Sequence, residues 1–207
     1  AARLWQVVAV LVALAGLAIR VAAIGTAAEG TSERSTVNPR ASRLRTSGLY
    51  SLVRHPLYAG NTITAVGLAA FTTRWYVPVI VLLLALLYHE RIAAREEAFL
   101  EERFGDQFRA WAREVPAMVP LGVRYRPSDV PFGWRRPLGS EFHGLMAIAS
   151  VVFVLDLFRA WLASGRLVFD PLWTSFFAGA AVLFAACSAL KKTTGVFRPR
   201  DQGGRVA

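Results

Sequence analysis

Five apolar segments constrain this chain more than any other feature, because they make lipid its natural solvent. Three approach the roughly 20 residues that a helix needs to cross a bilayer, and the other two are shorter. With 55% hydrophobic residues, the chain is more apolar than an ordinary soluble domain. We predict an all-α, polytopic helical membrane protein with about five transmembrane helices and a cytoplasmic helical extension. The segments are Leu4–Ala28, Leu57–Phe71, Trp75–His89, Phe142–Leu162 and Pro171–Leu190.

The two shorter segments form a hairpin that either spans the bilayer with tilt and thinning or is partly re-entrant. The segment 75–114 reads as one long helix that begins in lipid and emerges into water, with a break at Gly105. Five prolines between residues 116 and 137 then indicate an irregular connector. The single cysteine, Cys187, lies in an apolar segment, where we expect an inert packing thiol and no disulfide.

Positive charge predicts the orientation. Nineteen of the 24 lysines and arginines lie in the loop 29–56, the segment 91–139 and the tail after residue 190, whereas the opposite flanks hold four. Cytoplasmic loops carry such an excess, so we expect the N-terminus outside and these segments inside, at a bacterial inner membrane. Arg20, within the first segment, can snorkel toward the basic side. A net charge of +10 also suits a nucleic-acid binder, but arginines between apolar segments do not form one polar face.

Polar residues cluster where the hairpin begins and where its second helix leaves the apolar region. Arg54-His55-Pro56-Leu57-Tyr58-Ala59-Gly60 opens the hairpin, and Glu96-Glu97 follows it. Such groups at a membrane boundary cost desolvation energy unless they bind something. Pro56 can open a helix whose free N–H groups, with Arg54 and His55, favour a carboxylate or phosphate.

Glu96 and Glu97 face about 100° apart on a helix, so one can face a ligand while the other pairs with an arginine or water. His89 lies seven residues before Glu96 and shares its face. The alternative interpretations are a basic membrane flank, a solvated charged face and an ordinary boundary histidine. Three scattered histidines do not make a convergent ligand set, so we expect no metal site.

A series of ordered motifs runs through the first 120 residues: Thr46–Tyr50, Arg54–Gly60, Glu96–Leu100, Phe104-Gly105 and Val115–Pro120. Together they resemble the isoprenylcysteine carboxyl methyltransferase family, within the wider clan of phospholipid methyltransferases. The resemblance covers about residues 19–120. Two departures stand out: Phe108 and Trp111 replace two tyrosines of the pattern, and one crossing precedes the motif where relatives usually have at least two.

The resemblance implies an integral-membrane methyltransferase that uses S-adenosylmethionine and acts on a membrane lipid or lipid-linked acceptor, with O-methylation of a carboxylate or phosphate favoured. Arg54 and Glu97 are the expected catalytic residues, with Arg54 orienting the cofactor or an anionic acceptor. Glu96 and Glu97 would hold the ribose or amino group of the cofactor. The expected cofactor-binding residues are Tyr50, His55, Pro56, Tyr58, Gly60, His89, Glu96 and Glu97.

We divide the chain into a membrane methyltransferase core at 1–120, a connector at 121–140, and a C-terminal transmembrane hairpin with basic tail at 141–207. The core contains the hairpin 57–91 and a cytoplasmic helix 92–114. We hypothesise that the C-terminal hairpin takes the place of the missing N-terminal helices. The alternative functions are a non-catalytic membrane subunit of the same fold and an NADPH-dependent membrane reductase. The sequence specifies neither the acceptor nor the oligomeric state.

Overall fold

The computed structural model describes residues 2–26, 43–122 and 124–194. Apart from one isolated bridge between Gly48 and Arg126, these residues form helices, turns and irregular segments, which confirms the all-α prediction. A short 3₁₀ turn, Leu49–Ser51, precedes the second helix. The helices are α1 (Ala2–Gly25), α2 (Pro56–Ala70), α3 (Tyr76–Phe104), α4 (Asp106–Glu114), α5 (Arg135–Ser164) and α6 (Pro171–Thr193).

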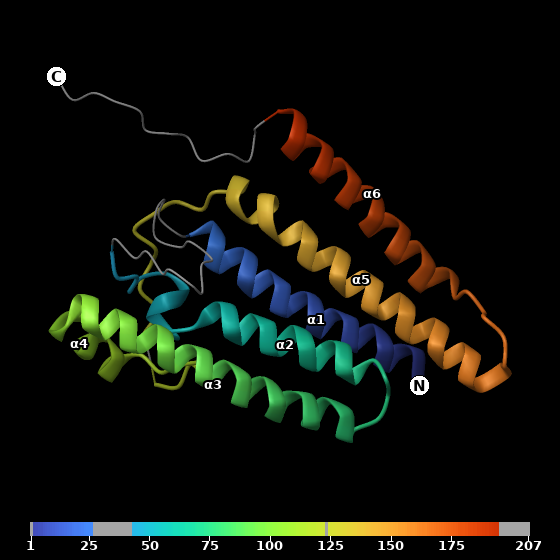
Figure 1. Ribbon diagram of the computed structural model, residues 1–207, viewed down its shortest axis with the longest axis horizontal. Helices are drawn as coiled ribbons and strands as arrows, with labels where there is room; N and C mark the ends of the chain where they lie inside the picture. The colour runs from blue at the N-terminus through green and yellow to red at the C-terminus, as the bar shows by residue number, and fades with distance from the viewer. Residues whose placement is uncertain (1, 27–42, 123, 195–207) are drawn as a thin grey trace.

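The long helices lie side by side in the order α3, α2, α1, α5 and α6 (Figure 1). By length and composition α1, α3, α5 and α6 can cross a membrane, and their outward faces are exposed and apolar. Helix α2 has 15 residues, so it is only about 22 Å long and shorter than a full crossing. These helices confirm the prediction of a polytopic integral membrane protein.

Glycines bring α1 and α2 into backbone contact. A Cβ atom on Gly67 would lie 2.4 Å from the Ala13 nitrogen, and one on Gly60 would lie 2.8 Å from the Gly16 carbonyl oxygen. Small residues permit this approach, which gains van der Waals contact where lipid offers no hydrophobic driving force. The contact fixes α2, whose first residues belong to the polar motif, against α1.

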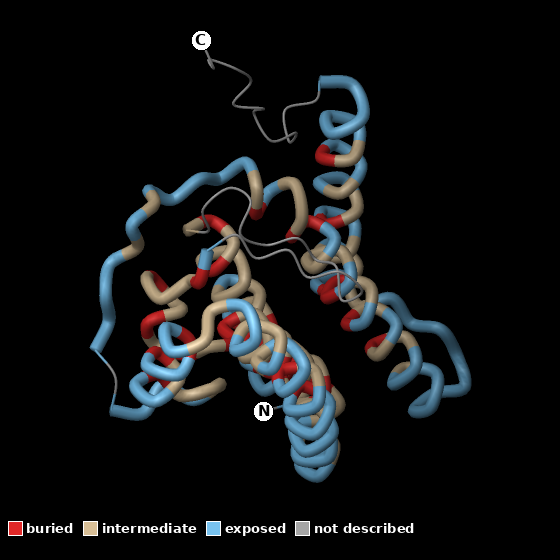
Figure 2. The backbone as a smooth tube through the Cα atoms, turned by 60° about the vertical axis from the view of Figure 1, so that its left-hand side comes forward, coloured by how far each residue is buried: buried red, intermediate tan, exposed pale blue. Residues whose placement is uncertain are grey.

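The C-terminal helices are attached to the rest of the bundle through α5. Ile148 and Val152 of α5 are buried with Ala13 of α1 in the largest apolar core, which also includes Phe71 and Trp173. Figure 2 shows the buried residues on the sides of the helices that face one another. The α5–α6 hairpin is therefore packed on α1, and it touches α2 only slightly.

Helices α5 and α6 each bury a further side chain, and the burial of Cys187 agrees with its expected packing role. Asp156 is buried and accepts a hydrogen bond of 2.7 Å from Arg159, three residues later on α5. Cys187 is buried within α6.

The predicted break at Gly105 separates α3 from α4. Gly105 has a φ of 52°, a left-handed conformation that costs glycine little. The chain turns there, so α4 folds back and buries Phe108 and Trp111 against Leu44 and Val115. These two aromatic side chains thus pack within the protein.

The segments with most positive charge meet at one end of the bundle. The C-terminus of α1, the start of α2, helix α4 and the start of α5 lie together there (Figure 1). Arg3, Arg74, Arg159 and Arg166 belong to the opposite end. Much of the basic loop and the tail, residues 27–42 and 195–207, lies outside the described part of the chain.

Candidate functional site

Backbone hydrogen bonds join two motifs that are 62 residues apart in the sequence. The N–H group of Arg54 donates to the Pro116 carbonyl at 2.8 Å, and that of His55 donates to the Ala117 carbonyl at 2.9 Å. Gly48, with a φ of 64°, pairs with Arg126 in the isolated bridge. The segment after α4 therefore holds the start of α2 in place.

A charged cluster links this segment to α3. Arg54 donates from Nε and Nη2 to the two Glu97 oxygens at 2.8 and 3.2 Å, while its Nη1 donates to the carbonyls of Ala112 and Val115 at 2.9 and 2.6 Å. His55 Nε2 contacts the same Glu97 carboxylate at 2.7 Å. The Arg54 and His55 side chains are 16% and 5% exposed, so this cluster is largely shielded from solvent.

Glu96 is held differently from its neighbour Glu97. Its carboxylate accepts a hydrogen bond of 2.9 Å from the Tyr58 hydroxyl and lies 3.6 Å from His55 Nδ1. Its side chain is 44% exposed, against 24% for Glu97. One carboxylate therefore pairs with arginine while the other stays accessible, which is the division that consecutive helical positions allow.

Three rings stack beside Glu96. The Tyr58 ring lies between those of His55 and His89, with centroid distances of 5.3 and 5.2 Å and nearly parallel planes. The Thr62 hydroxyl donates to the Tyr58 carbonyl at 3.0 Å and lies 3.0 Å from His89 Nδ1. His89 thus holds the Tyr58 ring in place between α2 and α3, by stacking on it and by its contact with Thr62.

The site shifts the pKa of His55. Burial lowers this pKa, but the carboxylates of Glu96 and Glu97 outweigh burial and leave the pKa of His55 above its ordinary value. The cationic form of the imidazole is therefore favoured next to the two glutamates. Burial also raises the pKa of Tyr50, which keeps its phenol neutral.

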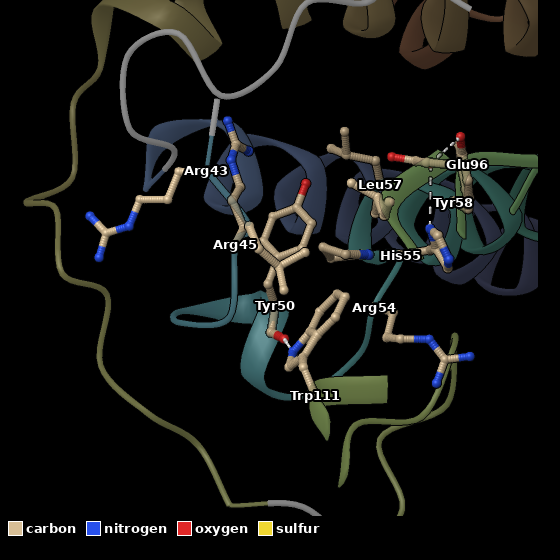
Figure 3. A pocket seen from close by; sticks show the side chains of 12 residues that line it. Arg43, Arg45, Tyr50, Arg54, His55, Leu57, Tyr58, Glu96 and Trp111 are labelled. Atoms are coloured by element: carbon tan, nitrogen blue, oxygen red, sulfur yellow. Dashed lines mark hydrogen bonds and ion pairs between the residues drawn. The ribbon is translucent and has the colours of Figure 1, made fainter. Parts of the chain in front are cut away.

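A cavity of ≈120 Å³ opens beside this cluster (Figure 3). Six of the expected site residues line it: Tyr50, Arg54, His55, Pro56, Tyr58 and Glu96. Glu97 lies behind His55, His89 lies behind Tyr58, and Gly60 lies at the α1–α2 contact. In Figure 3 the Arg54 guanidinium points away from Arg43 and Arg45.

Sequence reasoning missed several lining residues. Arg45 lies over the Tyr50 ring at 5.4 Å, and Trp111 Nε1 donates to the Tyr50 carbonyl at 3.2 Å. Arg45 counted only as a loop charge, and Trp111 only as a departure from a tyrosine pattern. The other missed lining residues are Arg43, Leu44, Leu57 and Leu100.

The start of α2 offers fewer free N–H groups than the expected anion site. Pro56 does occupy the first turn, as predicted. The N–H groups of Tyr58 and Ala59, however, both donate to the His55 carbonyl at 3.1 Å. They are therefore not free for an anion.

The cavity combines aromatic walls, one accessible carboxylate and a pair of arginines. Tyr50 and Trp111 offer flat faces for a ring, Glu96 can accept hydrogen bonds from hydroxyl or ammonium groups, and Arg43 and Arg45 can neutralise an anionic group. Among the described residues, no three His, Cys, Asp or Glu side chains are grouped to hold a metal ion.

Comparisons with known proteins agree on the motif region. The chain is 39% identical over 83 residues to the cobalt-zinc-cadmium resistance protein CzcN of Cupriavidus metallidurans, covering 40% of this chain and 38% of that protein. It is 32% identical over 78 residues to a protein-S-isoprenylcysteine O-methyltransferase of Schizosaccharomyces pombe, covering 38% and 33%. A similar enzyme of Arabidopsis thaliana is 33% identical over 82 residues, covering 38% and 40%.

The match thus spans between a third and two fifths of these relatives' length. No solved structure matches significantly. A model of the phospholipid methyltransferase family matches residues 4–107, half of the chain, including α1, α2 and α3 with the clustered motif residues of the site. The chain therefore belongs to the phospholipid methyltransferase family, in agreement with the resemblance of its motifs to the isoprenylcysteine carboxyl methyltransferases.

Proposed function

We propose that this protein transfers a methyl group from S-adenosylmethionine to a membrane lipid or lipid-linked acceptor. The observation that carries the proposal is the cavity itself: aromatic rings and the accessible Glu96 carboxylate meet where α3 extends past its apolar half, in a chain of this family. An amphiphilic acceptor in the bilayer and a water-soluble donor can meet only at such a boundary.

The residues present fit this cofactor. Its adenine ring has flat partners in Tyr50 and Trp111, its ribose hydroxyls or ammonium group can donate to Glu96, and its carboxylate suits Arg43 or Arg45. The cavity of ≈120 Å³ is smaller than the roughly 300 Å³ at the lower end of ligand sites. Binding therefore requires its wall to open, for example by movement of the Arg45 side chain off Tyr50.

Arg54 and Glu97 act in this proposal mainly by positioning. Four hydrogen bonds already occupy the Arg54 guanidinium, two of them to Glu97. Together they hold His55 against Glu96 and tie α3 to the segment after α4. His89 and Gly60 support the site in the same way, through Tyr58 and through the α1–α2 contact.

The bound cofactor supplies an electrophilic methyl group on a positively charged sulfur. For a carboxylate or phosphate acceptor, an oxygen lone pair would form the new C–O bond as the C–S bonding pair returned to sulfur, so no proton would have to move. The work of the protein is then to hold the two reactants in line, which can contribute about 7–11 kcal/mol in favourable cases. Such an acceptor needs no general base.

Orientation and organisation complete the proposal. The charge distribution supports a cavity on the cytoplasmic side with the N-terminus outside, and we propose a bacterial inner membrane as its location. The core 1–120, the connector 121–140 and the hairpin and tail 141–207 form its three parts. Helix α5 packs along α1 and connects that hairpin to the core, and Trp173 of α6 joins the core beside Phe71.

A methyl-transfer assay tests the function. Purified protein in nanodiscs of bacterial lipid would receive S-adenosylmethionine labelled in its methyl group, and label in the lipid extract would be measured. We expect transfer by the native chain and loss in Glu96→Gln, which keeps the size of the side chain but removes its charge. Arg91→Gln, an exposed change on the same helix, is the control. Folded protein with no transfer to any lipid fraction would refute the proposal and favour the non-catalytic subunit.

A further inference from the structure

A second cavity, of ≈430 Å³, lies between α1, α2 and α5. We call it the groove. None of the predicted site residues lines it, and one of its three walls comes from α5, which follows the 4–107 family match. Its volume falls within the roughly 300–1,000 Å³ of small-molecule sites.

The groove is polar at one end. Arg20 Nε and Nη2 donate to the two Glu141 oxygens at 2.8 and 2.9 Å, and its Nη1 donates to Asn61 Oδ1 at 2.6 Å. The side chains of Arg20 and Glu141 are 18% and 5% exposed, so they form a largely buried ion pair and not a solvent-exposed one. Their charges compensate each other, which makes this end of the groove, its mouth, nearly neutral. The exposed His143 also belongs to this end.

The rest of the groove is apolar. Leu68 of α2 and Ala147, Ile148 and Val151 of α5 line it further into the bundle. From Glu141 to Val151 the α5 wall extends about 15 Å at 1.5 Å per residue. Polar groups at one end and apolar groups along the helices match a lipid lying parallel to its bilayer neighbours.

The groove also continues from the candidate site along one face of α2. Leu57 lines the first cavity, and Asn61, Thr64 and Leu68 line the groove. Spacings of four, three and four residues place these side chains on one helical stripe. An acceptor whose chain lies in the groove can therefore present its headgroup end toward the cavity beside Tyr58.

We propose that the groove binds the hydrocarbon chain of the methyl acceptor, a single-chain amphiphile whose polar end lies at the Arg20–Glu141 mouth. This inference rests on the proposed function and adds to it a place for the acceptor. It also gives the C-terminal hairpin a role in substrate binding, because α5 supplies much of the groove lining.

The test uses a long-chain fatty acid that carries a photoreactive diazirine, added to the full-length protein in nanodiscs with S-adenosylhomocysteine. Labelled peptides would be mapped by mass spectrometry with and without excess unlabelled fatty acid. Ala147→Trp fills the groove from an exposed position, and Val151→Trp does so one turn deeper. Val154→Trp is the matched control, because Val154 is 60% exposed on the same helix but outside the groove.

We expect label on the groove walls that competitor removes, and a drop of about tenfold in Ala147→Trp or Val151→Trp but not in Val154→Trp. Binding of S-adenosylhomocysteine, measured on the same samples, should be unchanged in all three. Label spread evenly over exposed helix faces, or insensitive to competitor and to both groove variants, would refute binding of the acceptor chain in the groove. The proposed function would remain intact. Competed groove label without any S-adenosylhomocysteine binding would refute the function and, with it, the identity of the occupant as acceptor.

Discussion

Two arginine–carboxylate clusters link distant parts of this molecule. Both use a pair of hydrogen bonds from a guanidinium to a carboxylate, but they lie beside different cavities. Arg54 donates two hydrogen bonds to the Glu97 carboxylate, and Arg20 donates two to the Glu141 carboxylate. The first cluster lies behind the candidate cofactor cavity and also holds His55 and two backbone carbonyls. The second lies at the mouth of the groove and holds Asn61.

In the proposed function, the two clusters support different parts of the reaction, the cofactor cavity and the acceptor groove. The Arg54 cluster joins α3 to the segments before α2 and after α4, so its loss should disturb the cofactor cavity. The Arg20 cluster joins α5 to α1 and α2, so its loss should loosen the C-terminal hairpin and the groove. Substitutions in one cluster at a time should separate these two effects.

The largest effect is expected from Glu97→Gln. This change leaves Arg54 without its anionic partner and His55 with only the Glu96 carboxylate, in a largely shielded place, which should cost about 3–5 kcal/mol. Thermal unfolding in detergent would measure it, with calorimetry of S-adenosylhomocysteine showing weakened binding. Glu101→Gln is the control, since its partner Arg109 is about half exposed and such surface pairs contribute about 0–1 kcal/mol. Equal melting temperatures for Glu97→Gln and Glu101→Gln would show that the Arg54 cluster contributes no more stability than an exposed ion pair.

Glu141→Gln should cost slightly less, about 3 kcal/mol, because Asn61 still accepts from Arg20. Unlike Glu97→Gln, it should leave the affinity for S-adenosylhomocysteine unchanged. The double variant Arg20→Met/Glu141→Leu should recover much of the lost stability, since apolar groups can replace a buried pair. The comparison fails if Glu141→Gln weakens S-adenosylhomocysteine binding as much as Glu97→Gln does.

Gly60→Ala should destabilise by about 1–3 kcal/mol through overpacking. The new methyl group would lie 2.7 Å from the Arg20 Cγ atom and 2.8 Å from the Gly16 carbonyl, and backbone cannot move aside cheaply. Gly179→Ala on α6 has nothing within 4 Å and should gain up to about 1 kcal/mol from helix propensity. Melting temperatures of the two variants that move in the same direction would argue against the close α1–α2 contact.

The pH dependence of stability should reveal His55. Because its pKa is raised by Glu96 and Glu97, its contribution is fully present below the unfolded value of about 6.5 and is lost as pH rises through the folded pKa. The native chain should therefore lose on the order of 1 kcal/mol relative to His55→Gln over that interval. Parallel stability curves for the two proteins would show that folding does not shift the pKa of His55, against this prediction.

The sequence was enough to predict the helices and the polar site, because apolar runs and adjacent polar motifs are local signals. The break at Gly105 was predicted for the same reason. The Arg20–Glu141 pair was not, since it joins residues 121 positions apart, and Arg20 was expected to snorkel toward the basic side. The partners of Arg45 and Trp111 were missed too, because only the folding back of α4 and the loop brings them to Tyr50.

The central claim is that the cavity beside Glu96 binds S-adenosylmethionine, and calorimetry with S-adenosylhomocysteine tests it most directly. The detergent-purified protein would be titrated with this product and, in parallel, with NADPH. The account predicts binding of S-adenosylhomocysteine that is lost in Glu96→Gln and retained in Val154→Trp, with no binding of NADPH. Folded protein that binds NADPH, or that binds S-adenosylhomocysteine equally well without the Glu96 carboxylate, would contradict it.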